Sequence, residues 1–363
     1  MAPVRDTLVD LKKRNFFEKM AERYSKDTIL PNKRGFVGKP GSTIGIGYRI
    51  RSTKHGQKPY GSQHSLTINY GITRGAFFIE HKSDFNQVIG DWSMKILTRF
   101  DLKNVINYYG RGNDTVVDRE EDYYQLNSKE YLVSLGFGKW LGKYHEFALM
   151  GFFQSIKLNY EDSNYIITEV PDLKTSSVTK NFLGLTTGYR YYNKNNNLAP
   201  TKGLEVVGRV TYFGDLQADK DGFWRFTSFL STYLPINKFL TAASRIGLAT
   251  VSGDPQFYQL NILGGRENLR GFPRQRFYGT TSLFTNQELR LLIPTQMKLF
   301  DKIGILGFID AGRVWEPDEV SNTIHVGYGG GFIIIPFNKI VLNASYGISK
   351  EDAMTHLRVG YFF

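Results

Sequence analysis

The chain has 363 residues with no cysteine, an aromatic content of 15% and a formal net charge of +12. Its mean hydropathy is −0.32, and no stretch approaches the roughly 18 uninterrupted apolar residues of a membrane helix, so the sequence excludes membrane-spanning helices but not membrane-spanning strands. Basic residues are spread along most of the chain instead of being gathered on one face or arm, which argues against a nucleic-acid-binding protein.

The first 40 residues differ in pattern from the rest. Within residues 6–26, Phe17, Met20 and Tyr24 recur at spacings of three and four, as on one face of an amphipathic helix, and Lys and Arg fill many other positions. Because this apolar face is short and mixed with acids, we expect a helix packed at the mouth of the following domain, or a frayed linker. A helix that lies on a membrane surface is the alternative.

From residue 41 the apolar period changes to two. Large apolar residues then alternate with small or polar ones in runs near ten residues, longer than the usual soluble strand of about five or six. No helices are predicted that could cover so large a sheet. We therefore predict an all-β fold, a 16-stranded antiparallel transmembrane β-barrel, with strands at 41–51, 62–71, 75–84, 90–100, 103–113, 128–139, 144–158, 180–192, 203–213, 222–234, 239–250, 281–293, 303–316, 323–335, 339–349 and 354–363.

The predicted connections alternate between short turns and mostly longer loops. The longer set lies at 52–61, 114–127, 159–179, 214–221 and 251–280. A bacterial barrel has short turns in the periplasm and longer loops outside, and an even strand count returns both termini to the periplasm. We therefore expect a bacterial outer-membrane protein with an N-terminal periplasmic segment at 1–40 and a barrel domain at 41–363.

No motif of a catalytic or metal site is found in the sequence. The six histidines lack metal-ligand spacing such as HExxH, and there is no GxSxG or Walker-type loop. The glycines of residues 327–331 lie in a strand-like run without the following helix that a phosphate cradle needs, so we expect them to relieve crowding or bend the wall. We predict no enzymatic activity, no cofactor and no bound metal.

The longest predicted loop, 251–280, carries a glycine-rich segment in which an arginine follows an apolar residue and precedes a glycine and an aromatic residue. Its characteristic positions are Gly264, Gly265, Leu269, Arg270, Gly271 and Phe272. Glycines at such positions permit tight turns and a close approach of the backbone to a wall. Three further features follow in the chain, namely the acid Glu288, the run Phe308-Ile309-Asp310-Ala311-Gly312, and an aromatic end at Tyr361-Phe362-Phe363.

In this order and spacing, these features resemble the surface-antigen superfamily of outer-membrane barrels, which includes the Bam and Tam assembly barrels and the translocases of two-partner secretion. The resemblance covers about residues 40–363. It implies that loop 251–280 is the sixth extracellular loop and folds back into the lumen. It also implies that Phe308, Asp310 and Gly312 form the signature of the thirteenth strand, and that Glu288 is an acid of the twelfth.

The chain end at Tyr361 and Phe363 resembles the signal that outer-membrane proteins present for assembly. An ordinary place in the aromatic belt is the simpler interpretation of these two residues, and both can hold together.

A charged Arg270 in the lumen would need a carboxylate partner. Glu288 and Asp310 lie on adjacent predicted strands with inward phase, so we expect a forked, charge-assisted contact, here called the clasp, that pins the loop to the wall. A loop of about thirty residues is costly to order without such a pin. The clasp either plugs and stiffens the barrel or takes part in a transport cycle.

The resemblance implies a barrel that assists the assembly or export of outer-membrane or secreted proteins. The implied partners are client polypeptides and outer-membrane lipid, including lipopolysaccharide. Members with these roles carry periplasmic polypeptide-transport-associated repeats, whereas only about 40 residues precede the first predicted strand here. Two alternatives therefore stay open: a membrane anchor that binds a periplasmic or outer-membrane protein in a larger assembly, and a passive gated pore.

Overall fold

The computed structural model describes residues 43–52, 61–71, 75–159, 164–169, 179–217, 222–297, 299–317, 319–337 and 340–359. Three predictions lie outside these residues and stay predictions: the helix at 6–26, the role of segment 1–40, and the assembly signal at Tyr361 and Phe363.

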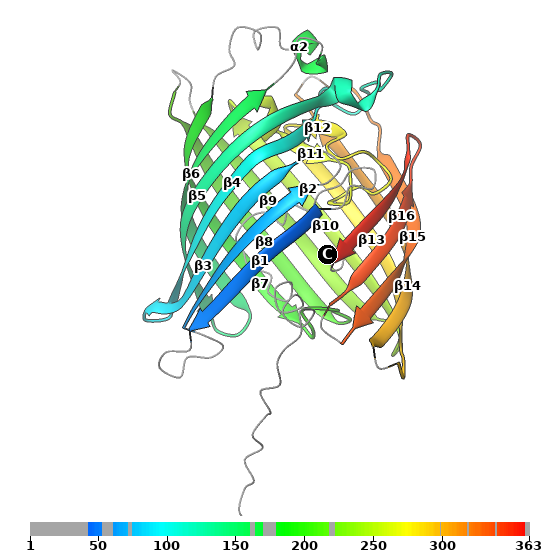
Figure 1. Ribbon diagram of the computed structural model, residues 1–363. Helices are drawn as coiled ribbons and strands as arrows, with labels where there is room; N and C mark the ends of the chain where they lie inside the picture. Colours follow the sequence, from blue (N-terminus) through cyan, green and yellow to red (C-terminus); the bar gives the residue numbers. More distant parts are fainter. Residues whose placement is uncertain are drawn as a thin grey trace, which may run out of the picture.

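One antiparallel sheet of fifteen strands dominates the described chain, and each strand pairs with its neighbours in chain order. Figure 1 shows the sheet curled into a barrel. The predicted all-β, antiparallel barrel is therefore confirmed. The strands are β1 (Thr43–Ser52), β2 (Ser62–Gly71), β3 (Phe77–Ile89), β4 (Trp92–Asn107), β5 (Gln125–Leu141), β6 (His145–Asn159), β7 (Lys180–Lys194), β8 (Gly203–Asp215), β9 (Phe223–Pro235), β10 (Leu240–Gly253), β13 (Thr281–Pro294), β14 (Phe300–Trp315), β15 (His325–Pro336), β16 (Leu342–Ile348) and β17 (Ala353–Val359).

The alternation of side chains explains why these segments form a barrel wall. On β13, Leu283 and Leu289 are exposed on the outer face, whereas Ser282, Asn286 and Glu288 are buried on the inner face. Successive side chains of a strand point to opposite faces, so an apolar exterior and a polar interior result from a period of two. Among the described residues, no helix is long and apolar enough to cross a membrane.

The separate strand predicted at 103–113 is wrong. Residues up to Asn107 continue β4, which pairs with β5 through a register shift between Asp101 and Asn104. β4 takes three steps from Asp101 to Asn104 while β5 takes two between their partners, so β4 carries one extra residue. One extra residue at a bulge reverses the inward and outward phase, so the bulge resembled a turn in the sequence. Residues 108–124 instead form a connection that ends in the 3-10 helix η2 (Glu121–Tyr124).

Because the predicted strand 103–113 is not a separate strand, the strand ends that flank connection 52–61 lie at the opposite end of the barrel from the one predicted. The end at which β4 meets β5 and β10 meets β13 is here called the loop end, and the opposite end the turn end. Because the strands run antiparallel in order, β1 runs from the loop end to the turn end (Figure 1). The prediction that grouped connection 52–61 with the long loops is therefore wrong, since the strand ends that flank it lie at the turn end.

The first described strand begins at one end of the barrel, and the last described strand ends at the other. β17 runs toward the turn end, whereas β1 starts at the loop end. The predicted location of both termini in the periplasm stays a prediction, because the residues before Thr43 and after Val359 lie outside the described part.

The connection between β10 and β13 folds into the upper interior of the barrel, as its yellow trace in Figure 1 shows. It contains the 3-10 helix η4 (Phe257–Gln259) and a small antiparallel pair, β11 (Asn261–Leu263) with β12 (Phe277–Gly279). Four of its apolar side chains form a cluster with Val314 of β14, and all five residues are fully buried, namely Leu263, Leu269, Phe272, Phe277 and Val314. The expected long loop folded into the lumen is thus present.

Candidate functional site

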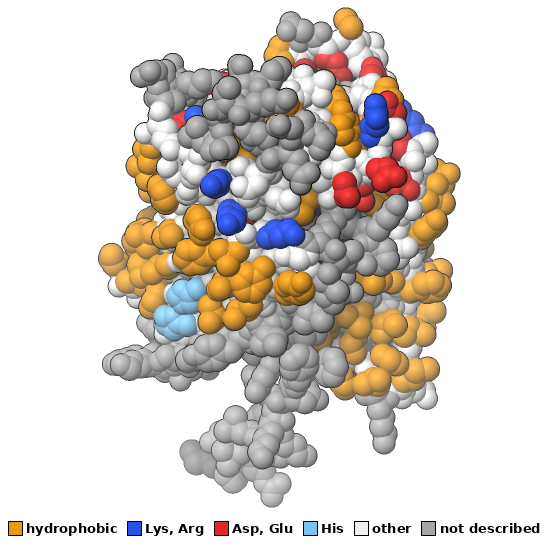
Figure 2. Space-filling model, turned by 45° about the horizontal axis from the view of Figure 1, so that its top comes forward, with side chains coloured by type: hydrophobic (Ala, Val, Ile, Leu, Met, Phe, Trp, Pro, Cys, Tyr) orange, Lys and Arg blue, Asp and Glu red, His pale blue; other side chains and the backbone are white. Residues whose placement is uncertain are grey.

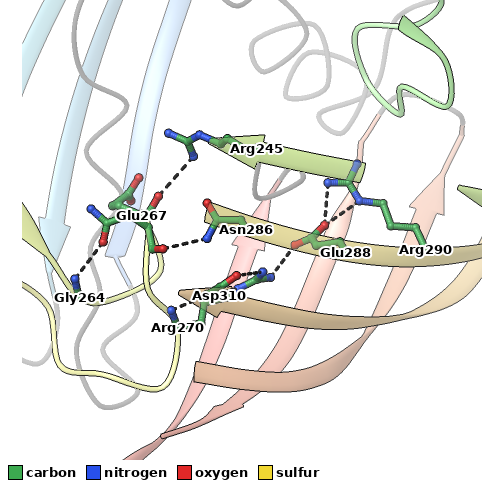
Figure 3. Close-up of polar contacts among 9 residues, drawn as sticks. Arg245, Gly264, Glu267, Arg270, Asn286, Glu288, Arg290 and Asp310 are labelled. Atoms are coloured by element: carbon green, nitrogen blue, oxygen red, sulfur yellow. Dashed lines mark hydrogen bonds and ion pairs between the residues drawn. The ribbon is translucent and has the colours of Figure 1, made fainter. Parts of the chain in front are cut away.

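The centre of the site is the guanidinium of Arg270 (Figure 3). Its Nε and Nη2 donate to Asp310 Oδ2 and Oδ1, both at 2.7 Å, and its backbone N–H donates to Oδ2 at 3.0 Å. Its Nη1 donates to Glu288 Oε1 at 2.6 Å. Two parallel N–H···O bonds to one carboxylate are the strongest and most directional form of ion pair. The structure therefore brings the three expected clasp residues together.

A second arginine completes the charge balance around Glu288. Arg290 lies two residues further along β13, on the same inner face, and its Nε and Nη2 each approach Glu288 Oε2 at 2.7 Å. Two buried cations thus face two buried carboxylates, the second of which is Asp310. Because buried charges are tolerated only when paired and hydrogen-bonded, this balance makes the clasp possible inside the lumen.

The electrostatics of Arg270 follow from the same geometry. Burial by itself would lower the pKa of its guanidinium, but the carboxylates of Glu288 and Asp310 outweigh burial, and the pKa of Arg270 is raised. The arginine therefore stays charged.

The other two residues of the β14 signature serve the same loop. The ring of Phe308 lies beneath the guanidinium of Arg270, with Cζ 3.5 Å from the ring centroid, so the cation is held against the face of an aromatic ring. Gly312 leaves room for the loop, because a Cβ there would stand 3.0 Å from Leu263 Cδ1. The spacing of two places Phe308, Asp310 and Gly312 on one inner face.

Glycines let the loop backbone lie directly on the wall. Gly271 adopts a left-handed φ of 91°, and a Cβ on it would stand 2.8 Å from the carbonyl carbon of Ile348 on β16. A Cβ on Gly327 of β15 would overlap the carbonyl oxygen of Arg270. The hydroxyl of Ser349 donates to the Gly271 carbonyl at 2.7 Å. The expected relief of crowding in the 327–331 run is thus explained at residue 327 by the approach of the loop.

Two asparagines fix the fold of the loop before the clasp. Asn268 accepts from the backbone N–H of Gly264 at 2.9 Å and donates to the carbonyl of Ile262 at 2.8 Å. Asn286 of β13 donates to the backbone carbonyl of Asn268 at 2.8 Å. Gly264 and Gly265 both have left-handed φ values, of 115° and 76°, which a residue with a side chain rarely adopts.

The connection 108–124 covers the loop from the loop end of the barrel. The side-chain amide of Asn113 donates to the carbonyl of Val314 at 2.8 Å and accepts from its N–H at 3.1 Å. Arg276 donates to Glu351 at 2.6 Å and to the hydroxyl of Thr115 at 2.5 Å. These contacts join three connections of the loop end into one cap over the lumen.

A tyrosine buried in this cap also has a perturbed acidity. Tyr108 donates to Glu169 of α2 (Tyr165–Glu169) at 2.5 Å. Burial and the neighbouring carboxylate raise the pKa of Tyr108 well above its usual range, so its hydroxyl remains a donor to Glu169.

A separate charge network lies in the lumen away from the loop. Arg190 of β7 and Glu205 of β8 approach to 2.5 Å, and Lys194 donates to Glu205 at 2.7 Å. Sequence reasoning missed this network, as it missed Arg290, Asn268 and Asn113. Only Arg290 carried a usable signal, because its spacing of two from Glu288 places both on one face. No group of three or more His, Cys, Asp or Glu in the described chain is placed to hold a metal.

Fold and site together define a class: an antiparallel β-barrel of the outer membrane whose longest loop is held in the lumen by a buried arginine. Residues 91–360 match the model of the Omp85 superfamily domain. The chain belongs to the Omp85 superfamily. The surface-antigen resemblance of the sequence is thereby confirmed.

Solved structures of similar fold agree with this assignment. BamA from Haemophilus ducreyi, in a form that lacks POTRA domains 1–3, superimposes with a TM-score of 0.61 at 17% identity over 89% of this chain and 69% of that one. CdiB from Acinetobacter baumannii gives 0.57 at 13% identity over 88% of this chain, which spans only 57% of that protein. CdiB from Escherichia coli gives 0.51 at 13% identity, over 94% and 69%. No curated protein sequence matches the chain.

Proposed function

We propose that this barrel assists the insertion of outer-membrane proteins or the export of secreted ones, and that it does so without enzymatic chemistry. The observation that carries the proposal is the arginine clasp, because it makes a long loop part of the barrel wall. The loop extends from β13 and β14 to the last strands of the sheet: Arg266 Nη1 donates to the carbonyl of Leu357 on β17 at 3.2 Å. A change in the conformation of the loop would therefore alter its contact with β17, the last strand of the described sheet.

The last two strands are the shortest in the described part of the wall. β16 and β17 have seven residues each, whereas β4 and β5 have 16 and 17. Fewer ladder hydrogen bonds hold a short strand, and an available strand edge can accept a strand of another polypeptide. Within the described residues, β17 pairs with β16 alone. We infer that a client strand would add to the barrel at this edge.

The proposed orientation has the loop end outside the cell and the turn end in the periplasm. The long connections 108–124 and 254–280 are gathered at one end, and short turns such as 90–91 and 142–144 at the other, as in bacterial outer-membrane barrels. Under this orientation, β17 runs toward the periplasm. The proposed partners are client polypeptides arriving from that side and the surrounding outer-membrane lipid.

Reconstitution of the full chain into lipid vesicles tests the proposal. An unfolded outer-membrane barrel is added as client, and its folding is followed by protease protection. We expect the vesicles that contain the protein to fold the client several times faster than empty ones, and Arg270→Ala to lose most of this gain. The matched control is Arg190→Ala, which removes another buried lumen arginine, from the charge network of β7 and β8.

Three outcomes would count against the proposal. Client folding at the rate of empty vesicles would reject it outright, and equal losses in the two arginine variants would reject the role of the clasp. A stable partner recovered from native membranes, together with no effect on client folding, would instead favour a membrane anchor. Ion conductance with no client effect would favour a passive pore.

A further inference from the structure

Three lysines form a row on the outer face of adjacent strands. Lys103 lies on β4, Lys129 on β5 and Lys157 on β6, and all three side chains are exposed. Each lies near the loop end of its strand. Neighbouring strands are about 4.8 Å apart, so the backbone positions of the row span about 10 Å across the wall.

The arrangement of these lysines opposes the stability of the sheet. Lys129 and Lys157 are direct cross-strand partners, and like charges placed opposite one another on one face of a sheet repel. Within the described part of the chain, none of the three lysine side chains forms an ion pair or hydrogen bond with the protein. An anion from outside the chain would remove the repulsion.

The row lies at the upper border of the apolar exterior. Phe100 and Tyr131, which are cross-strand partners on β4 and β5, pack edge to face with ring centroids 5.7 Å apart just below Lys103 and Lys129. In Figure 2, Lys and Arg side chains lie directly above the orange apolar band of this face. Aromatic girdles mark the membrane–water interface of such barrels, and a lysine next to them reaches the level of lipid head groups.

Charge and position together point to one ligand. We propose that Lys103, Lys129 and Lys157 bind the phosphate groups of lipopolysaccharide, through its lipid A part, in the outer leaflet. A row of three ammonium groups fits a lipid with more than one phosphate better than a lipid with one. Beyond the row, the exposed amides of Asn127 and Asn159 are again direct partners and offer donors to the sugar.

This assignment rests on the proposed orientation of the barrel, because only the loop end would then face the outer leaflet. It does not rest on client handling, since lipid binding is measured without a client. If the protein did not speed up client folding but still bound the lipid, the proposed lysine site would therefore still be supported.

The test compares two triple variants of the full chain in uncharged detergent. K103Q/K129Q/K157Q removes the row, and K143Q/K202Q/K238Q removes the same charge from exposed lysines of the turn end. The probes are bis-phosphorylated lipid A, dephosphorylated lipid A and inorganic pyrophosphate. We expect the row variant to bind bis-phosphorylated lipid A at least about tenfold more weakly, since each lysine near an anionic surface contributes measurably, and the control variant to bind like the wild type. Pyrophosphate should not compete at millimolar concentration.

A single substitution provides a second measurement that does not depend on the triple variant. Lys129→Gln relieves the repulsion with Lys157, so in uncharged detergent its unfolding midpoint should equal or exceed that of the wild type. In lipid A the order should reverse. Equal binding of lipid A by both triple variants, or tight binding of the dephosphorylated lipid, would overturn the proposal, as would an unfolding order for Lys129→Gln that is the same in both media.

Discussion

The carbonyl oxygen of Arg270 lies where a Cβ on Gly327 would stand. The same residue extends its guanidinium in another direction, to Glu288 of β13 and Asp310 of β14. One loop residue therefore contacts three consecutive strands, through its side chain on two of them and its backbone on the third. Its neighbour Gly271 packs against Ile348 of β16, the strand next to the edge strand β17 of the described sheet.

Arg270→Ala is expected to destabilise the barrel by about 3–5 kcal/mol, because two buried carboxylates lose their shared partner. Loop 254–280 should become sensitive to added protease. The double variant Arg270→Ala/Asp310→Asn should recover part of the loss in a urea unfolding series, since one of the uncompensated charges is then absent. Equal midpoints for the single and double variants, with the loop still protected, would show that Arg270 is not the pin.

Gly327→Ala is expected to displace the loop although it adds only one methyl group. The new Cβ would overlap the carbonyl oxygen of Arg270, which is backbone and cannot rotate away. A loss of about 1–3 kcal/mol is the usual effect of such overpacking. Gly307→Ala on β14 is the matched control, because a Cβ there meets only one atom, 4.0 Å away. Urea unfolding of the two variants decides the point, and equal stabilities would contradict it.

Phe308→Leu keeps an apolar side chain but removes the aromatic face beneath the Arg270 guanidinium. The loss of a buried cation–π contact should lower stability by about 1–2 kcal/mol, less than the loss of the arginine itself. A double-mutant cycle with Arg270→Ala measures the coupling. A cycle with no coupling energy would mean that the ring serves only to fill space.

Asn113→Ala is expected to loosen the cap without releasing the clasp. The substitution leaves the N–H and carbonyl of Val314 without their side-chain partner, which costs about 1–3 kcal/mol for each buried group that stays unpaired. Protease added from outside should cut connection 108–124 faster, while the loop below stays protected. Val116→Ala in the same connection, where the side chain is exposed, is the control and should leave the rate unchanged.

Much of the clasp could be predicted from the sequence, because a strand has a fixed period of two. The spacing of Phe308, Asp310 and Gly312 places them on one face in any register, and an arginine in a long loop beside two inward acids has few alternative partners. The same rule applied to β13 would have added Arg290 to the set with Glu288. These inferences need only the local geometry of the strand.

Tertiary structure alone decided where one strand ended and what the loop touched. The bulge between Asp101 and Asn104 reversed the inward phase within β4, and a local pattern cannot separate such a reversal from a turn. The direction of the strands from β4 back to β1, and therefore the end of the barrel at which β1 begins, followed from that single point. The contacts of Asn113 with Val314 and of Gly327 with Arg270 join residues far apart in the chain, and only the closed three-dimensional packing of loop and wall brings them together.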